Sequence, residues 1–456
     1  MSYRTPSASQ QERLVVDLTQ AISAMTQECC AWLSAAPRSL FELEQEVRCR
    51  LQALGGLLVE RLCRLQSERY PEPSVPCPCG GQAHYQRRRA IAVDTLLGRL
   101  RLVRPYYLCP TCHQGQAPLD AQWGVCANSV SLGLEQVLAL LGVNLPFADV
   151  QAVMETLVGV TVSPTTAQEA TERVGQAIAA AEAQAEAATF QVAAALPPTL
   201  RVVGPERLYV SVDGTMVHLG AEGWKEVKLG AIYTTRTHPA RETGKAPEVR
   251  AEQQSFVADV CEAKAFGRLV WLEAARRGVL AAKEVVVIGD GSHWIWSLAA
   301  DHFPQAVQIV DWYHASQYIW QVAHACYGEG TATATAWAEA RLNELWDGQV
   351  ETVLEAMQPL SGCAEAVQEA STYLSNNRER LRYAQYRARG LQVGSGSIES
   401  ACKQVIGARL KQAGMRWSRV GARAVAKARA WWKSGRWQEA VALLAPRQRS
   451  YHRKAA

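Results

Sequence analysis

Residues 208–219 read LYVSVDGTMVHL, and residues 284–290 read EVVVIGD. The first stretch alternates between Asp213 and other polar or aromatic residues on one face and valines on the other, as a β-strand does. The second is a β-branched apolar run of the kind found in strands that are buried on both faces, and it ends at Asp290. The two stretches therefore predict a sheet that carries an acidic residue on each of two strands.

Further strands and helices are expected around these two stretches. The sequence indicates strands at 226–235, 255–260 and 306–311, and helices at 263–278, 292–303 and 313–328. Three strands, then a helix, then alternating strands and helices are the order of a ribonuclease H-like core. Helical sequence from about 332 to 390 follows as an insertion. The motif VGSGSIESACK (393–403) then brings in Glu399 at the start of another helix.

These three acids suggest metal chemistry if they converge. Carboxylates are hard oxygen ligands, which suit Mg²⁺ or Mn²⁺. Two such ions, about 3.5–4 Å apart, activate the attacking oxygen and stabilise the leaving oxygen in phosphodiester cleavage. Asp213, Asp290 and Glu399 are therefore the candidate catalytic and metal-binding residues. Asp311 also ends a predicted strand and competes for the role of second acid, although a structural role in orienting His314 is favoured.

Composition places the chain among multidomain globular proteins. It has 456 residues, of which 48% are hydrophobic, and this length predicts two to four domains. No apolar run is long enough to span a membrane, and the N-terminal residues lack an apolar signal core. Thirteen cysteines in such a chain favour reduced thiols or metal binding over disulfides. A cytoplasmic protein without a membrane partner is expected.

Basic charge is concentrated near the C-terminus. Residues 400–456 contain fourteen Lys or Arg and one acid, Glu439, giving +13 against −8 for the remainder. This asymmetry is typical of a surface that binds a polyanion. The candidate DNA-contacting residues are Lys403, Arg409, Lys411, Arg416 and Trp417, the last by stacking on an unpaired base. A solvated basic helix and packed tryptophans are the structural alternatives.

The N-terminal region is predicted to be helical. Leucines and a valine recur every three or four residues between Leu40 and Leu65, which places them on one stripe. We expect the stripe to pack against the chain's own core, although a dimer seam is the alternative. Gly55 and Gly56 weaken the case for a long continuous coiled coil.

Two close pairs of cysteines predict a zinc site. Cys77 and Cys79 precede a hairpin, and Cys109 and Cys112 follow it. This is the layout of a zinc ribbon, in which four thiolates surround one Zn²⁺. The first pair has one intervening residue where two to four are usual, so His84, His113 or Cys126 could replace a member. Arginines in and beside the hairpin would suit contact with the DNA backbone.

Residues from about 130 to 192 form a second predicted helical region. Two short helical stretches precede a long one that begins at Ser163 and Pro164, a favourable N-cap and first helical residue. The order resembles a helix-turn-helix, although a plain helical bundle fits equally well. The segment ALPPTL (195–200) is expected to be a linker.

Taken together, the motifs resemble a known family. VDGT around Asp213, VVVIGDGSHWIWSLA around Asp290, FPQAVQIVDWYHASQYIW, VGSGSIESACKQVIGARLKQAGMRW and the cysteine pairs are similar to those of DDE transposases of the Mutator-like superfamily. The similarity is greatest to the Kra-type bacterial insertion-sequence transposases, and it spans roughly residues 75–440. The superfamily places an Asp- or Cys-x-x-His element after the second acid, which Asp311 and His314 supply.

The resemblance implies a function and a domain order. Asp213, Asp290 and Glu399 would be the catalytic triad of a Mg²⁺- or Mn²⁺-dependent transposase that cuts and joins double-stranded DNA. Such an enzyme would work as a homo-oligomer at the bacterial nucleoid. The expected domains are a helical region (1–72), a zinc ribbon (73–126), a helical, possibly helix-turn-helix region (127–196), a ribonuclease H-like catalytic domain (205–415) with an insertion at about 330–390, and a basic helical tail (416–456).

Two other functions fit parts of the sequence. A ribonuclease H-like nuclease or domesticated transposase would cut DNA without strand transfer. A regulator with a zinc ribbon and a helix-turn-helix would bind DNA while its acids were incidental.

Overall fold

The computed structural model describes residues 7–70, 72–126, 129–190, 204–239, 248–360, 363–394 and 396–444. The chain divides into two compact units, residues 1–171 with 441–456 and residues 172–440. The described residues form a mixed α/β protein with two five-stranded sheets, as the sequence predicted at this level. Within these residues, no helix combines the length and the apolar character needed to cross a membrane. The predicted linker at 195–200 falls outside the described residues.

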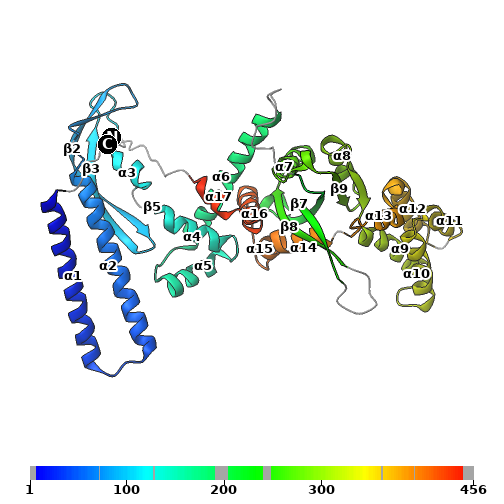
Figure 1. Ribbon diagram of the computed structural model, residues 1–456, viewed down its shortest axis with the longest axis horizontal. Helices are drawn as coiled ribbons and strands as arrows, with labels where there is room; N and C mark the ends of the chain where they lie inside the picture. The colour runs from blue at the N-terminus through cyan, green and yellow to red at the C-terminus, as the bar shows by residue number, and fades with distance from the viewer. Residues whose placement is uncertain are drawn as a thin grey trace. The chain divides into compact units, whose positions relative to one another are not determined.

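The first unit begins with a long helical hairpin, α1 (Ala8–Ala35) and α2 (Leu40–Glu68) (Figure 1). Each helix starts with a reciprocal capping box, at Ser7 and at Ser39, which satisfies backbone N–H groups of the first turn. α2 runs without interruption through Gly55 and Gly56. A Cβ on Gly56 would lie 3.1 Å from a Leu100 methyl carbon, so the glycine permits close packing on the neighbouring sheet.

The leucine stripe of α2 packs on the chain's own core only in part. Val59 and Cys63 contact the core of the sheet, and Leu54, Leu58 and Leu65 are half-buried. Several other apolar side chains of the hairpin are exposed, and α1 buries no residue: the exposed set includes Val15, Ile22, Leu33, Leu40, Phe41, Val47, Leu51 and Leu62. The expectation that the whole stripe is internal is therefore corrected.

The sheet of the first unit is built on the predicted hairpin. β2 (Gln82–Thr95) and β3 (Gly98–Leu108) pair antiparallel, and β1 (Ser74–Pro76), β4 (Gly115–Gln116) and β5 (Ser129–Val130) add short edges. A small apolar core lies beneath it, formed by Ile91, Val93, Leu100, Leu102 and Val125. The short helix α3 (Pro118–Trp123) follows, and its Asp120 pairs in a buried bidentate contact with Arg104.

A second core of this unit joins the next helices. They are α4 (Leu132–Gly142), α5 (Phe147–Val153), the π-helical turn η1 (Met154–Val158) and the start of α6 (Pro164–Phe190). Leu134, Leu138, Val150 and Met154 are fully buried within it. Two short helices and a long one are as predicted from the sequence, whereas a helix-turn-helix function stays a prediction.

The second unit is organised around a sheet of order β10-β9-β6-β7-β8. β6 (Arg207–His218), β7 (Trp224–His238) and β8 (Glu248–Asp259) form an antiparallel meander. β9 (Glu284–Gly289) and β10 (Val307–Val310) continue the sheet on the other side of β6, and both run parallel to their neighbours. Each of the predicted strands is present within about three residues of its expected bounds, except that β8 begins seven residues earlier than predicted.

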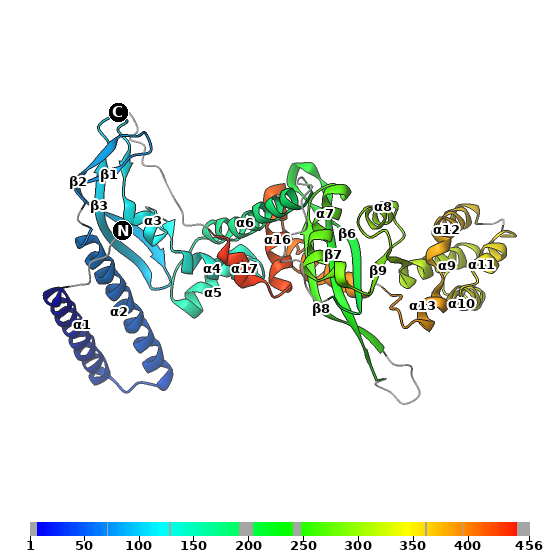
Figure 2. The same ribbon diagram turned by 45° about the horizontal axis from the view of Figure 1, so that its top comes forward.

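Helices connect and cover these strands. α7 (Ala263–Arg276) and the turn η4 (Val279–Ala281) lead from β8 to β9, and α8 (His293–His302) leads from β9 to β10. The predicted helical insertion follows β10 and gathers beside α9 (Figure 2). α9 spans Trp312–Tyr327, and the insertion contains α10 (Ala332–Trp346), α11 (Val350–Met357), α12 (Ala364–Asn377), the turn η5 (Arg378–Arg380) and α13 (Tyr383–Ala388).

One disulfide joins two of these helical segments. Cys326 of α9 is bonded to Cys363, the residue before α12, with a Cα–Cα distance of 5.3 Å. The expectation of reduced thiols is therefore wrong for this pair. Spacing along the sequence gave no signal, because the two cysteines are separated by 37 residues of helical insertion.

The chain then returns to the sheet. α14 (Gly396–Ala401) continues into the π-helical segment η6 (Cys402–Gly407) and the short α15 (Ala408–Leu410). α16 (Arg419–Lys433) and α17 (Trp437–Ala442) follow. π-Helical turns are rare and occur often at functional sites. Here the turn directly follows the helix that carries Glu399.

α16 is not the free basic tail that the charge pattern suggested. It lies in the second unit, and ten of its residues are buried, Lys427 and Arg429 among them. Its cations meet buried acids: Asp259 bonds Arg423 through both carboxylate oxygens and lies 2.7 Å from Lys427 Nζ. Much of the C-terminal positive charge is thus neutralised inside the fold.

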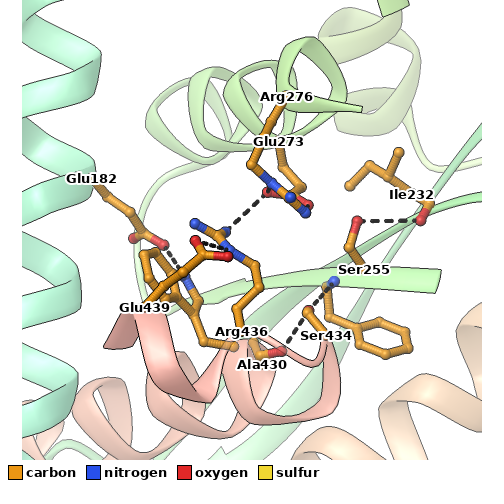
Figure 3. A network of polar contacts seen from close by, with 11 residues as sticks. Glu182, Ile232, Ser255, Glu273, Arg276, Ala430, Ser434, Arg436 and Glu439 are labelled. Atoms are coloured by element: carbon orange, nitrogen blue, oxygen red, sulfur yellow. Dashed lines mark hydrogen bonds and ion pairs between the residues drawn. The ribbon is translucent and has the colours of Figure 1, made fainter. Parts of the chain in front are cut away.

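A second network extends this packing toward α17 (Figure 3). Arg436 pairs with Glu273 of α7 at 3.1 Å and with Glu439 at 2.9 Å. Ser434 accepts the Phe256 N–H at 2.8 Å and donates to the Ala430 carbonyl. These contacts join α16, α17, β8 and α7.

Candidate functional site

Three aspartates lie in a row across adjacent strands, Asp213 within β6 and Asp290 and Asp311 directly after the ends of β9 and β10. The parallel register of β6 and β9 pairs Ser211 with Ile288, so two residues further on Asp213 stands beside Asp290. The register of β9 and β10 pairs Gly289 with Val310, so Asp290 stands beside Asp311. The Asp311 N–H donates to the Gly289 carbonyl at 2.8 Å, which continues the pairing to this point. Residues at matching positions of parallel strands project to the same side of a sheet.

Glu399 reaches this row from α14. The strand-like segment before α14 is held at the sheet, because the Trp312 N–H donates to the Val393 carbonyl at 3.0 Å. A carboxylate oxygen of Glu399, one of Asp311 and a ring nitrogen of His314 all lie within 4.8 Å of one another. This group contains neither Asp213 nor Asp290, so among the aspartates of the row it is Asp311 that Glu399 approaches.

Cys402 joins the same site from the first residue of η6. Its thiol donates to Oδ2 of Asp213 at 3.5 Å, and Oδ1 of Asp213 accepts the Gly214 N–H at 2.7 Å. Burial raises the pKa of Cys402, and the charge of Asp213 adds to this, so the sulfur stays a neutral thiol. Cys402 lies within the quoted VGSGSIESACK motif, but sequence reasoning assigned it no role.

Asp311 and His314 form a tightly bonded pair. Asp311 is fully buried and caps α9, accepting the His314 N–H at 3.1 Å and lying 2.7 Å from the ring Nδ1. This hydrogen bond to Asp311 raises the pKa of His314, and the charges of Asp290 and Asp213 act in the same direction. These bonds fit the predicted positioning role, and that role stays a prediction, because Asp311 also belongs to the group of potential ligands with Glu399.

Asp290 is held by the turn that follows β9. Its two carboxylate oxygens accept the Ser292 N–H at 2.8 Å and the Ser292 hydroxyl at 2.9 Å. The Asp290 carbonyl accepts the Tyr373 hydroxyl of α12 at 2.7 Å. Gly291 has a φ of 100°, and a Cβ there would lie 2.5 Å from the Tyr373 ring, so only glycine fits. Tyr373 had no signal in the sequence, since it belongs to the insertion.

The charge balance of the site suits a cation. Burial raises the pKa of Asp213, and the negative charge of Asp290 raises it further. Neighbouring carboxylates in a partly buried site repel each other unless a proton or a positive ion lies among them. Asp213, Asp290 and Glu399 could therefore hold one or two divalent ions, with Asp311 and His314 beside them.

A hollow of about 1050 Å³ opens beside Gly291, the residue that follows Asp290. It lies between α8 and α12, and Gly291 and Tyr373 form its border with Asp290. Its wall includes Asn376, Asn377 and Arg380 beside the rings of Trp296 and Tyr373, so it presents amide and guanidinium groups within a largely apolar surface. A polar ligand that approached the acids from this side would find hydrogen-bonding partners.

The predicted DNA-contacting residues fall into two groups. Lys403, Lys411 and Arg416 are exposed, and Lys411 Nζ lies 3.4 Å from the Thr215 hydroxyl, two residues beyond Asp213. Arg409 and Trp417 are buried, with the guanidinium 4.9 Å from the centre of the indole ring. The Trp417 indole N–H donates to the Leu410 carbonyl at 3.1 Å. The suggestion that Arg409 and Trp417 contact DNA is corrected, since neither reaches the surface.

The first unit contains a second cluster of potential ligands. Sulfur atoms of Cys77, Cys79, Cys109 and Cys112 all lie within 4.8 Å of one another. Cys77 and Cys112 are 3.5 Å apart, and Cys79 and Cys109 are 3.6 Å apart. Zn–S bonds of about 2.3 Å place tetrahedral sulfurs about 3.8 Å apart. This set could therefore hold one Zn²⁺.

The alternatives His84, His113 and Cys126 are not part of that cluster. The compressed first pair is accommodated by a tight turn, in which the Gly80 N–H donates to the Cys77 carbonyl and the Cys77 N–H to the Gly81 carbonyl. Hydrogen bonds from the backbone N–H groups of Cys112 and Thr111 lower the pKa of Cys109 to about 6. Such bonds favour a thiolate, which is the form that binds metal.

Comparison with known proteins identifies a family. Residues 82–445 match the uncharacterised protein family UPF0236. The chain belongs to this family. The match covers Asp213, Asp290 and Glu399, whereas the α1–α2 hairpin and the first cysteine pair precede it. No curated protein matches the chain.

Proposed function

We propose that this chain is a DDE-type DNA transposase. The observation that carries the proposal is the alignment of Asp213, Asp290 and Asp311 on β6, β9 and β10, together with the approach of Glu399 to Asp311 and His314. The strand order supports it, because an antiparallel meander extended by two parallel strands is the arrangement expected of a ribonuclease H-like core. The helical insertion before Glu399 and the resemblance of the motifs support it further.

In this proposal, Asp213, Asp290 and Glu399 hold two divalent ions, Mg²⁺ or Mn²⁺. When bound, such ions lower the pKa of the attacking hydroxyl and neutralise charge on the leaving oxygen. The carboxylates are positioned beforehand: Cys402 and Gly214 fix Asp213, and Ser292 fixes Asp290. His314 stands beside them with its Nδ1 held by Asp311.

Neither step of the proposed reaction requires a cofactor that supplies energy. In the first step, water attacks the phosphorus at the element's end, and the bond to the 3′-oxygen breaks to leave a 3′-hydroxyl and a 5′-phosphate. In the second, that 3′-hydroxyl attacks a target phosphorus, and one phosphodiester replaces another. Lys403, Lys411 and Arg416 are exposed near this site and would neutralise DNA phosphates. The cysteine cluster would hold Zn²⁺ and support the hairpin structurally.

A strand-transfer assay with paired ends tests this function. Purified protein, Mg²⁺, DNA carrying both ends of its own element and a supercoiled target plasmid are incubated, and joined products are sequenced. We expect end cleavage and joining by the wild type and neither by Asp213→Ala, Asp290→Ala or Glu399→Ala. Cleavage without joining would instead support a nuclease. DNA binding without any cleavage, unchanged in the three variants, would support a regulator.

A further inference from the structure

Among the described residues, one group of potential metal ligands contains Asp311, His314 and Glu399, and His314 is its nitrogen ligand. Its ring lies with Glu399 and Asp311 inside a 4.8 Å group, and the charges of Asp213 and Asp290 act on it. The role of this ring in the site therefore depends on which of its two nitrogens is available.

The contact with Asp311 determines which nitrogen of His314 is available. The Asp311 carboxylate lies 2.7 Å from Nδ1 and also accepts the backbone N–H of His314, so the ring is held at two points. Asp311 is fully buried at the strand end, and α9 fixes both residues within one turn. With Nδ1–H donated to a carboxylate, Nε2 is the nitrogen left with a free lone pair. Histidines that bind metals are oriented in this manner by a carboxylate on the other nitrogen.

We propose that His314 is a metal ligand, binding through Nε2 to a divalent ion that it shares with Glu399. This inference rests on the proposed function, because it places the nitrogen on one of the ions held by the acids. Asp311 is then a positioning residue that acts through His314. The ion site has mixed nitrogen and oxygen ligands rather than carboxylates alone.

A nitrogen ligand changes which metals the site prefers. Sites made only of carboxylate and water suit Mg²⁺, whereas an imidazole increases the affinity for transition metals. Mn²⁺ accepts both ligand types. We therefore expect the wild-type chain to bind Mn²⁺ more tightly than Mg²⁺, and we expect that preference to depend on His314.

Pulsed electron paramagnetic resonance detects the proposed bond directly. Untagged full-length protein, with the cysteine cluster saturated with Zn²⁺, is loaded with substoichiometric Mn²⁺, and the electron spin echo envelope is recorded. A ligating imidazole produces ¹⁴N modulation. We expect this signal in the wild type and in His293→Gln, a nearby exposed histidine on α8 that is outside the cluster. It should be absent in His314→Gln.

Titration calorimetry with Mn²⁺ and Mg²⁺ provides the second readout. His314→Gln should lower the Mn²⁺ affinity about tenfold or more and the Mg²⁺ affinity much less. Asp311→Asn should keep the ¹⁴N signal while lowering the Mn²⁺ affinity about 10–100-fold, as loss of an orienting partner does. Circular dichroism spectra identical to that of the wild type confirm that each variant is folded.

The outcomes separate this inference from the proposed function. Mn²⁺ binding that Asp213→Asn abolishes, but that shows no ¹⁴N modulation, would overturn the role of His314 and leave the acidic metal site intact. Modulation that persists in His314→Gln would also overturn it. A wild-type chain that binds no Mn²⁺ beyond the zinc cluster would overturn the metal-dependent function together with this ligand.

Discussion

The thiol of Cys402 donates a hydrogen bond to Oδ2 of Asp213 at 3.5 Å, joining residues 189 positions apart in the sequence. The contact ties the helix that carries Glu399 to the strand that carries Asp213. Because the thiol stays neutral, it donates to the carboxylate without adding charge. The two acids are thereby held near each other before any ion binds.

Replacing Asp213 by Asn should stabilise the metal-free chain at neutral pH. Burial and Asp290 raise the pKa of Asp213 in the folded chain. Protonated Asp213 therefore favours folding, and this contribution is present below the unfolded pKa and lost as pH rises through the raised one. In EDTA at neutral pH, Asp213→Asn should add on the order of 1 kcal/mol to the free energy of unfolding.

With added Mg²⁺ or Mn²⁺, the wild type should instead be more stable than Asp213→Asn, because ligand binding stabilises only the wild type. Denaturant unfolding with and without metal measures both effects. Asp301→Asn, on the exposed side of α8, is the matched control and should change neither. A wild type that gains no stability from either ion would contradict the prediction.

Removing one thiol of the cysteine cluster should remove zinc. The chain should carry about one Zn²⁺, since four thiolates complete a structural site. Cys79→Ser should lose that ion and lower the melting temperature, because binding of structural zinc contributes directly to folding. Cys49→Ser, at an exposed position of α2, should retain it. Elemental analysis by mass spectrometry checks the content, and equal zinc in both variants would refute the assignment.

Asp259 should be among the most sensitive acids of the second unit. Burial alone would raise its pKa, but Arg423 and Lys427 together lower it. Asp259→Ala removes one of the carboxylates that pair with buried Lys427, so we expect the free energy of unfolding to fall by about 3–5 kcal/mol. Glu222→Ala removes the exposed partner of Arg419 and should lower the free energy of unfolding much less, because exposed ion pairs contribute little.

The lowered pKa of Asp259 also predicts how stability depends on pH. Because the pKa of Asp259 is lower in the folded chain, its contribution is present above the unfolded pKa and is lost as pH falls through the folded one. The stability difference between wild type and Asp259→Ala should therefore shrink in acid. Equal unfolding midpoints for Asp259→Ala and Glu222→Ala at neutral pH would show that the buried network has been misjudged.

Exposed and buried cations after Glu399 should behave differently. We expect weaker DNA binding from each of the exposed variants Lys403→Ala, Lys411→Ala and Arg416→Ala. Each should also reduce the slope of log K against log salt concentration by about one, which corresponds to one lost phosphate contact. Arg409→Ala should chiefly lower stability, because its guanidinium is buried against Trp417. Fluorescence anisotropy at several salt concentrations and thermal melts separate the two effects. A surface substitution that leaves the salt slope unchanged would remove that residue from the interface.

Local patterns were enough to predict the strands and the acids. The alternation around Asp213 and the apolar run before Asp290 correspond to β6 and β9. Neither stretch of sequence specifies the register that aligns the two carboxylates. It depends on backbone pairing between strands that 65 residues separate, from His218 to Glu284.

Other features depend on packing that composition cannot specify. The basic residues after Glu399 look alike in sequence, yet Arg409 is buried and Lys411 is exposed. Gly56 reads as a helix breaker, although contact with Leu100 makes it the residue that fits. The position of Tyr373 against Asp290 arises from folding of the insertion back onto the sheet.

Cleavage of element-end DNA in Mg²⁺ by wild type and Asp290→Asn, compared at equal DNA occupancy, tests the central claim most directly. Asp301→Asn serves as the control for charge removal on the adjacent helix. We expect the wild type and Asp301→Asn to cut at the element's ends, and Asp290→Asn to be slower by roughly a hundredfold or more. Equal cutting by Asp290→Asn and the wild type would contradict the claim that this row of carboxylates is the catalytic centre.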